Sequence, residues 1–526
     1  MTGRAPPVGG STPGRRSERD RHVDLLRIVS LSMVVIGHWL AVVVTWEEGT
    51  VSGENALNVV PGMWPLTWLF QVMPLFFFVG GFANRKSYES VCRRGGGYVA
   101  FVTLRLERLL IPTVAFLAMG LTAATLLDAL GLIEDLLRPA ARVVTLPLWF
   151  LGVYVIVLAV TPPMLFLHRR FGSAVIVALA AAAVAVDLLR FGLDSESVGY
   201  LNYAFVWLLV HQLGFVHADG TVQRFAAPLG ATGFGLLVAL IALGPYPASL
   251  VGISSDEIDN MNPPTLAILA LAACQIGVAL LARAPLTRWL ERERVWRWVV
   301  GLNLRIMTVF LWHLAAILPT IAVIYPLGFP QPDPGSAAWW ALRPAWIVLQ
   351  IPVLALLVAL YGRFEVMGRR TADATASEAE TALGRVMAGL GALYAGLGVI
   401  SYARLGLEPV YSDRARDVTV IDVNSARGFV HLVLAIALLW AAAGGSVAAR
   451  RTTIPAVVVL TLLALLGPLD SGPLATTAPE AVLHAVSAAV LLAARVLSTD
   501  GRPAGPSRRE CDHHDGTGQR IRELNR

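Results

Sequence analysis

Long apolar segments separated by short connectors run along almost the whole chain. Ten of them fall in the first two thirds of the sequence, at about residues 25–45, 66–84, 109–128, 146–167, 173–189, 201–217, 226–244, 264–282, 303–325 and 339–361. Four more lie near residues 383–400, 428–443, 453–468 and 480–497. About 20 apolar residues form a helix long enough to cross a bilayer. The pattern therefore predicts an all-α, polytopic integral membrane protein, with ten transmembrane helices in a core and about four C-terminal ones.

The connectors alternate in charge along the chain. Several arginines precede the first apolar segment and several glutamates follow it, namely Arg15, Arg16, Arg19 and Arg21 before it and Glu47, Glu48 and Glu54 after it. Further arginine-rich connectors lie between segments two and three, after four, between eight and nine, and after ten. Basic connectors favour the cytoplasmic side of a membrane. We therefore expect a multi-pass protein of the plasma membrane with both termini in the cytoplasm.

These boundaries divide the chain into five parts. We expect residues 1–22 and residues 499–526 to be disordered cytoplasmic tails. Residues 23–365 form the ten-helix membrane domain, and residues 383–498 form a four-helix C-terminal membrane module. The small and acidic residues of 366–382 are typical of a linker. The first 22 residues have neither an apolar h-region nor a cleavage site of small residues, so we expect the first apolar segment to act as an uncleaved signal-anchor.

The composition narrows the function classes. The chain is 56% hydrophobic and 15% charged, whereas a soluble protein carries about a quarter charged residues; its mean hydropathy is +0.64. The net charge is +6, and the basic residues that produce it lie in the connectors between apolar segments, where membrane topology places them. We therefore expect no nucleic-acid partner. The three cysteines have no metal-ligand spacing, and His513 and His514 are best explained by a solvated tail, so we expect neither a metal site nor a bound cofactor. The single lysine, Lys86, is typical of a GC-rich bacterial genome.

Two polar residues interrupt the first apolar segment. Arg27 and His38 are eleven positions apart, so a helix would carry both on one face, about 16 Å apart. Asp24 is expected to pair with Arg27 and to cap the helix. A capped, snorkelling helix start is the alternative to a functional role for these two residues. His38 lies too deep to snorkel. Its imidazole either hydrogen-bonds a neighbouring helix or accepts a proton from a hydroxyl nucleophile, and the spacing does not separate these alternatives.

Four further residues are candidates for a site. Arg105 and Arg108 form one basic helix face suited to a phosphate or a lipid head group, although membrane topology explains two arginines here equally well. His313, in the ninth segment, is expected at a depth where it can approach His38, with packing as the alternative. Trp149 is either the wall of a substrate site or an interfacial aromatic residue.

Two of the C-terminal segments begin alike. Arg427-Gly-Phe-Val-His431 and Glu480-Ala-Val-Leu-His484 each place a histidine four positions after a charged residue. At this length chance explains the duplication as well as common descent does. We assign the C-terminal module no activity.

Five motifs in sequence order resemble the bacterial integral-membrane family called acyltransferase 3. They are Arg27 and His38 with ten residues between them, Phe76-Phe-Phe-Val-Gly-Gly-Phe, Arg105-x-x-Arg108 with Pro112, Trp149-Phe-Leu, and Leu311-Trp-His313. The resemblance covers about residues 20–365. The chain departs from the family at Gly80-Gly81, where Ser-Gly is common. It also departs before the late Trp-His, where Met307, Thr308 and Phe310 replace the usual serine and tyrosine.

The resemblance implies an O-acylation, commonly the transfer of acetyl from acetyl-CoA to a hydroxyl of an extracytoplasmic or membrane-associated acceptor. It implies that His38 is the essential histidine, that Arg27 is its paired residue, and that Arg105 and Arg108 bear on the acyl donor. Acyl-CoA is then a co-substrate, and a glycan, lipid or metabolite of the cell envelope is the acceptor, with membrane lipids as further partners. We count Asp24 and His313 with the catalytic group and Trp149 with substrate binding.

A proton-coupled secondary transporter or polysaccharide exporter is the main alternative, with the same histidines as a proton relay. Such folds are often built from inverted repeats. The later half of the chain has no second copy of the Arg27–His38 spacing, which favours the enzyme. A non-catalytic membrane scaffold is the third possibility, and it fits the last four segments better than the first ten.

Overall fold

The computed structural model describes residues 20–47, 50–129, 143–252, 258–371, 381–405, 416–418, 421–423, 425–469 and 476–498. Nearly all of the two predicted tails and the middle of the predicted linker lie outside these residues. Within the described part, ten helices are long and apolar enough to cross a membrane, and three sharply bent helix pairs raise the number to 13. The remaining predicted span corresponds to α11 (Asn202–Ala218), which has 17 residues. The prediction of an all-α, multi-pass membrane protein is confirmed.

The core helices, in chain order, are α1 (Arg21–Ala41), α2 (Ala56–Val59), α3 (Pro65–Phe70), α4 (Met73–Arg93), α5 (Tyr98–Ala129), α7 (Leu148–Ala159), α8 (Thr161–Phe171), α9 (Ala174–Gly192), α10 (Glu196–Gly199), α11, α12 (Ala226–Leu243), α13 (Leu266–Leu281), α14 (Arg283–Trp289), α15 (Glu293–Asn303), α16 (Ile306–Trp312), α17 (Ile317–Ile324) and α18 (Ala337–Thr371). The C-terminal module consists of α19 (Ala382–Leu405), α20 (Ser425–Ala443), α21 (Gly445–Leu466) and α22 (Ala478–Leu497). Its only strands in the described residues are β3 (Arg416–Val418) and β4 (Ile421–Val423), which pair with each other.

The first helix is shifted from its predicted limits at both ends. Asp20, not Asp24, caps it, because the Asp20 carboxylate accepts hydrogen bonds from the backbone N–H groups of His22 and Val23. The helix ends at Ala41 instead of continuing to residue 45. The β-branched residues that follow form strand β1 (Val42–Glu47), which pairs antiparallel with β2 (Thr50–Asn55).

Two of the predicted spans are broken helices. The fourth bends by 53° between α7 and α8, where two prolines begin α8 and cannot donate helical hydrogen bonds. The ninth bends by 54° between α16 and α17. His313 lies directly after α16, at this second break.

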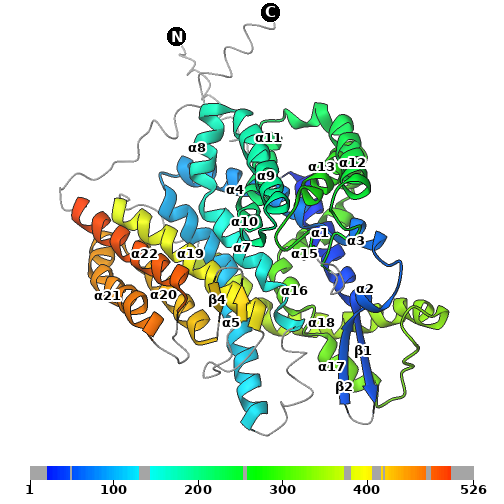
Figure 1. Cartoon of the computed structure of the whole chain (residues 1–526). Coiled ribbons are helices and arrows are strands. Elements are labelled where there is room, and N and C mark those ends of the chain that lie inside the picture. The colour runs from blue at the N-terminus through cyan, green and yellow to red at the C-terminus, as the bar shows by residue number, and fades with distance from the viewer. Residues whose placement is uncertain are drawn as a thin grey trace, which may run out of the picture.

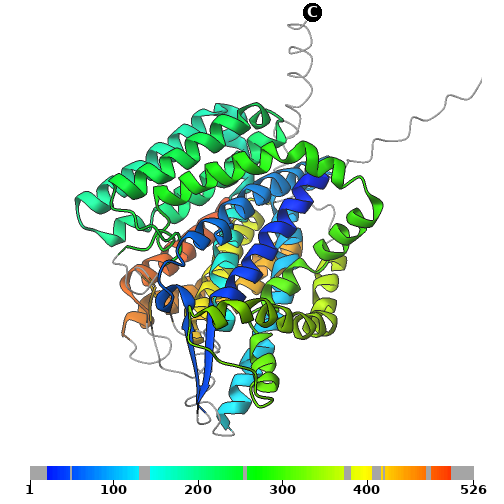
Figure 2. The ribbon, with the colours of Figure 1, turned by 90° about the vertical axis from the view of Figure 1, so that its right-hand side faces the viewer.

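The core and the C-terminal module lie side by side, as Figure 1 shows. Helix α19 of the module packs against α7 and α5 of the core. Figure 2 shows α1 and α4, in blue, running through the middle of the molecule, with the β1–β2 hairpin projecting from one end. We call this the hairpin end. The start of α1 marks the opposite, arginine end, where Arg283 pairs with Asp20 at 3.0 Å.

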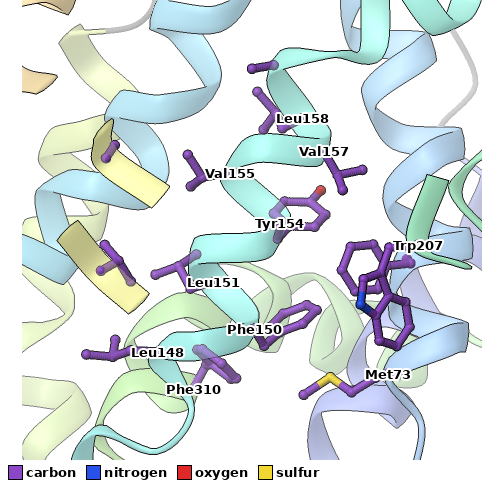
Figure 3. Close-up of a cluster of buried hydrophobic side chains, with 14 of the residues drawn as sticks. Met73, Leu148, Phe150, Leu151, Tyr154, Val155, Val157, Leu158, Trp207 and Phe310 are labelled. Carbon is purple, nitrogen blue, oxygen red and sulfur yellow. The ribbon is translucent and has the colours of Figure 1, made fainter. Parts of the chain in front are cut away.

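Helix α7 is apolar on all sides, as suits a helix that other elements surround. Figure 3 shows Phe150 and Tyr154 pointing toward Trp207 and Met73, while other side chains leave the opposite face of the helix. On the module side, Gly152 of α7 faces Gly396 of α19. A Cβ atom at either glycine would lie within 3 Å of the other's carbonyl oxygen, so the two helices touch through their backbones.

Glycines also permit the contact between α4 and α11. A Cβ atom at Gly81 would collide with the carbonyl oxygen of His211, and one at Gly214 would collide with the carbonyl oxygen of Phe78. This close approach places Asn84 Nδ2 3.2 Å from His211 Nε2. The two helices therefore form one unit that holds polar side chains within the core.

We predict that Gly81→Ala lowers the thermal stability of the detergent-solubilised protein. The methyl group has to push α11 away, and overpacking of this kind costs about 1–3 kcal/mol. Gly235→Ala on α12 is the matched control, because nothing lies within 4 Å of a Cβ atom there and alanine favours a helix by up to about 1 kcal/mol over glycine. Thermal unfolding of both variants provides the measurement, and equal midpoints would contradict the prediction.

Candidate active site

The structure brings His38 and His313 into direct contact. His38 Nδ1 lies 2.8 Å from His313 Nε2, and the two rings are stacked with their centroids 5.1 Å apart and an interplanar angle of 9°. His313 is buried, whereas His38 is only partly buried. Two histidines from distant segments thus form one unit, which we call the histidine pair.

The contacts of the histidine pair determine where its protons lie. His313 Nδ1 is 2.6 Å from the carbonyl oxygen of Phe310. A carbonyl only accepts hydrogen bonds, so this nitrogen carries the proton and, in the neutral ring, Nε2 carries the lone pair. That lone pair accepts from His38 Nδ1–H. The proton of neutral His38 is therefore on Nδ1, and its Nε2 is the basic nitrogen.

The helix break after α16 is linked to the histidine pair through the His313 side chain. In a continuous helix the carbonyl of Phe310 would accept from the backbone N–H four residues later, but here the His313 side chain occupies it. The indole of Trp39 donates to the carbonyl of His313 at 2.7 Å, and the carbonyl of Trp39 accepts from the indole of Trp346 at 2.8 Å. The His313 imidazole and the Trp39 indole thus bond carbonyls at the helix break, and the Trp346 indole bonds a carbonyl near the end of α1.

His38 lines a cavity of about 350 Å³, which we call the histidine cavity. Its walls are mostly apolar, and they carry polar side chains from several elements: Gln71, Tyr203, Asp259 and Asn262. Trp149, the predicted substrate-binding residue, also lines it. Since His38 stands near the end of α1 that leads into the hairpin, this cavity lies toward the hairpin end.

A second cavity, of about 210 Å³, contains Arg27, Arg105 and Arg108. We call it the arginine cavity. Arg105 Nη2 donates to Asn84 Oδ1 at 2.6 Å and lies 3.4 Å from the Tyr154 hydroxyl. Three guanidinium groups thus face one hollow near the arginine end. The sequence placed these arginines in two separate segments, and packing brings them together.

Asp24 takes the position expected beside Arg27 but lines neither cavity. Its carboxylate is 3.6 Å from the Arg27 guanidinium, and its backbone carbonyl accepts from Asn303 Nδ2 at 3.1 Å. Asp24 therefore lies where it can orient the Arg27 guanidinium group. The pairing agrees with the helical spacing of three residues.

The two cavities approach each other along α1. Leu31 lines the arginine cavity and Val34 lines the histidine cavity, a separation of about 4.5 Å along the helix axis. Phe150 and Phe310, visible in Figure 3 with ring centroids 5.8 Å apart, line the arginine cavity on this side. The Phe310 ring is also 6.2 Å from that of His313. The histidine pair therefore adjoins both cavities, since His38 lines one and His313 lies beside Phe310, which lines the other.

A family model described as an acyltransferase domain matches residues 20–362, which include the histidine pair and the three arginines. The chain belongs to the acyltransferase 3 family. It is therefore a membrane acyltransferase, as the five motifs indicated. The four helices of the C-terminal module lie outside the match. Comparisons with curated proteins and with solved structures gave no match.

The acyltransferase departs from the family pattern at positions that packing explains. Gly80, where serine is common, lies against Tyr154, and a Cβ atom there would be 2.7 Å from the tyrosine ring. Thr308, which precedes the late Trp-His, donates to Glu365 Oε2 through its backbone N–H at 3.0 Å and its hydroxyl at 2.9 Å. At Gly80 the Tyr154 ring occupies the space that a serine side chain would need. At Thr308 the Glu365 carboxylate accepts the hydrogen bonds.

Sequence reasoning missed three residues of the arginine cavity or its support, namely Asn84, Tyr154 and Glu365. Each is a polar residue within a membrane-spanning helix, and such residues commonly face a functional cavity. The polar character of these residues is visible in the sequence, but it does not show which partner each residue has. Asn84 also bonds His211 of the neighbouring helix α11.

Proposed function

We propose that this acyltransferase moves an acyl group from cytoplasmic acyl-CoA to a hydroxyl of an acceptor on the other side of the plasma membrane. Acetyl is the first acyl group to test. The acceptor class is a surface glycan, a lipid or a metabolite of the cell envelope. One observation carries the proposal: His38 of the histidine pair lines a cavity toward the hairpin end, while His313 lies beside Phe310 of a cavity with three arginines.

The arginine cavity supports the choice of donor. Coenzyme A carries several phosphates, and guanidinium groups bind phosphate through charge-assisted, often bidentate hydrogen bonds. The arginine end is the cytoplasmic end under the positive-inside rule, and acyl-CoA is a cytoplasmic metabolite. The thin pantetheine arm suits the short step along α1 from Leu31 to Val34 that separates the two cavities.

The histidine cavity supports an acceptor that enters from the hairpin end. Its polar side chains lie on mostly apolar walls, which suits a hydroxylated molecule with an apolar portion. Asp259 and Asn262, from the segment between α12 and α13, supply two of these polar side chains. Each substrate then reaches the histidine pair from its own side, so neither has to cross the membrane completely.

The reaction uses His38 as the general base. The acceptor hydroxyl gives its proton to His38 Nε2 while its oxygen bonds to the thioester carbonyl carbon. The tetrahedral intermediate then collapses, the carbon–sulfur bond breaks, and the CoA thiolate leaves with the proton from His38. His313 keeps the Nδ1–H of His38 oriented through the 2.8 Å contact, and this hydrogen bond strengthens while His38 is charged.

We predict that His38→Gln abolishes most of the acylation. General base catalysis contributes about 10²–10⁴-fold in rate, so a fall of at least about 100-fold is expected at normal protein abundance. Mass spectrometry of surface glycans, lipids and secreted metabolites, compared with a deletion strain, identifies the acyl mass that is lost. His22→Gln is the matched control, because His22 is a buried histidine on the same helix that bonds the carbonyl of Ala279.

If the deletion removes an acyl mass that His38→Gln leaves in place, His38 is not the base. If uptake or export changes while every acyl mass stays constant, the transport hypothesis replaces the proposed reaction.

We also predict that Arg105→Ala combined with Arg108→Ala raises the KM for acyl-CoA at least about tenfold, because each lost charge-assisted contact costs about 1.5–3 kcal/mol. Initial rates in proteoliposomes with varied acyl-CoA give the value. The double variant Arg294→Ala with Arg297→Ala removes the same charge from exposed positions of α15 and should leave this KM unchanged. An unaltered KM in the first variant would remove these arginines from the donor site.

A further inference from the structure

The C-terminal module contains a second histidine pair that the acyl transfer does not use. His431 on α20 and His484 on α22 approach each other through their Nε2 atoms at 3.1 Å. Glu480, one turn before His484 on α22, lies beside them. The three side chains are almost completely buried, with exposed fractions of 4%, 1% and 1% for His431, Glu480 and His484.

We infer that His431, Glu480 and His484 bind one divalent transition-metal ion, with zinc as the best fit. The Nε2 atoms are 3.1 Å apart, and His431 Nε2 is 3.6 Å from Glu480 Oε1. One potential ligand atom from each residue lies within 4.8 Å of the others. Zinc bonds to histidine nitrogen at about 2.0–2.1 Å in tetrahedral geometry, which separates two ligand nitrogens by about 3.3 Å. The three atoms are thus placed around one point.

The chain arranges these ligands through elementary helix geometry. Glu480 and His484 are four residues apart, so α22 presents both on one face. The third ligand comes from the neighbouring bundle helix α20. The 53 positions between His431 and His484 explain why no metal-binding motif is visible in the sequence.

The second pair differs from the pair in the active site in how its rings are held. There, the Phe310 carbonyl fixes the proton of His313, and the protein alone accounts for the arrangement. In the module, the Nδ1 atoms of His431 and His484 are buried and have no hydrogen-bond partner among the described residues. No protein contact therefore selects the opposite tautomers that a direct N–H···N bond requires. A metal ion that accepts both Nε2 lone pairs itself selects the same tautomer in both rings, with each proton on Nδ1.

Arg427 orients the carboxylate ligand. Its guanidinium lies 2.5 Å from Glu480 Oε2, so the other oxygen, Oε1, is the one nearer to His431. Carboxylate ligands of metals are commonly hydrogen-bonded in this way through the oxygen that does not bind the ion. The contact between Arg427 and Glu480 also explains why the similar starts of α20 and α22 carry opposite charges.

The site also has room for a further ligand. His431 and Glu480 line a largely apolar cavity of about 440 Å³ between the module and the core. Three protein ligands with one open position are typical of zinc sites that bind water or a substrate, whereas purely structural sites have four protein ligands. Trp149 and Tyr203 line both this cavity and the histidine cavity. The metal site therefore adjoins the proposed acceptor site.

Metal binding to the full-length protein tests this inference. The protein is purified in detergent with His513→Ala and His514→Ala as the background, so that the tail histidines cannot contribute. It is stripped with a chelator and titrated with Zn²⁺ and, separately, with Co²⁺. We expect about one ion per chain, visible d–d absorption of four-coordinate Co²⁺, and a higher thermal unfolding temperature with Zn²⁺.

Variants assign the ligands. His431→Gln and His484→Gln should each weaken Zn²⁺ binding by more than about 100-fold, and Glu480→Gln should weaken it and change the Co²⁺ spectrum. His38→Gln is the matched control, since it alters the other histidine pair and should bind Zn²⁺ like the background protein.

The comparison of the background protein, which keeps all three ligands, with the variants decides the outcome. If the background protein binds no Zn²⁺ beyond the His431→Gln, His484→Gln double variant, or shows no thermal shift with Zn²⁺, the inference is wrong. These readouts do not depend on acyl transfer, so either proposal can fail without the other.

Discussion

The hydrogen bond from the His313 imidazole to the carbonyl of Phe310 is the interaction on which the active site depends. Inside a membrane, every backbone group needs a partner within the protein. Here one partner is a side chain, so the helix breaks after Trp312, and the same bond assigns the proton of His313. The assignment passes through the histidine pair to His38, whose Nε2 then carries the lone pair. Satisfying one carbonyl thus sets both the local backbone and the chemistry.

Backbone contacts between helices give this arrangement its rigidity. Gly81 and Gly214 bring α4 and α11 together, and Gly152 and Gly396 join the core to the module. In a lipid environment, close packing and hydrogen bonds replace the hydrophobic effect as the force between helices. The α4–α11 contact also brings Asn84 to the position where it holds Arg105. The position of the Arg105 guanidinium group therefore depends on the glycines that let α4 and α11 approach each other.

The described residues contain two contacting histidine pairs that differ in their surroundings. The first is anchored by a carbonyl and opens on a cavity, as a proton-transferring group requires. The second lies beside a carboxylate held by Arg427, and its outer nitrogens have no partner in the described residues. The same side chain suits base catalysis in one place and metal ligation in the other. The neighbouring groups, not the histidines, make the difference.

The sequence by itself determined the membrane class, nearly all of the spans, the family, and the placement of Arg27 and His38 on one helix. These features depend on local properties, namely apolar length, charge alternation and the helical repeat. The tertiary structure decided the contacts between segments: the bond between His38 and His313, the support of Arg105 by Asn84, and the meeting of α20 with α22. It also decided that Asp20 caps α1 and that strand β1 replaces its predicted last turn. Such contacts depend on which helices pack together, and an apolar pattern shows that a helix is buried without showing its neighbour.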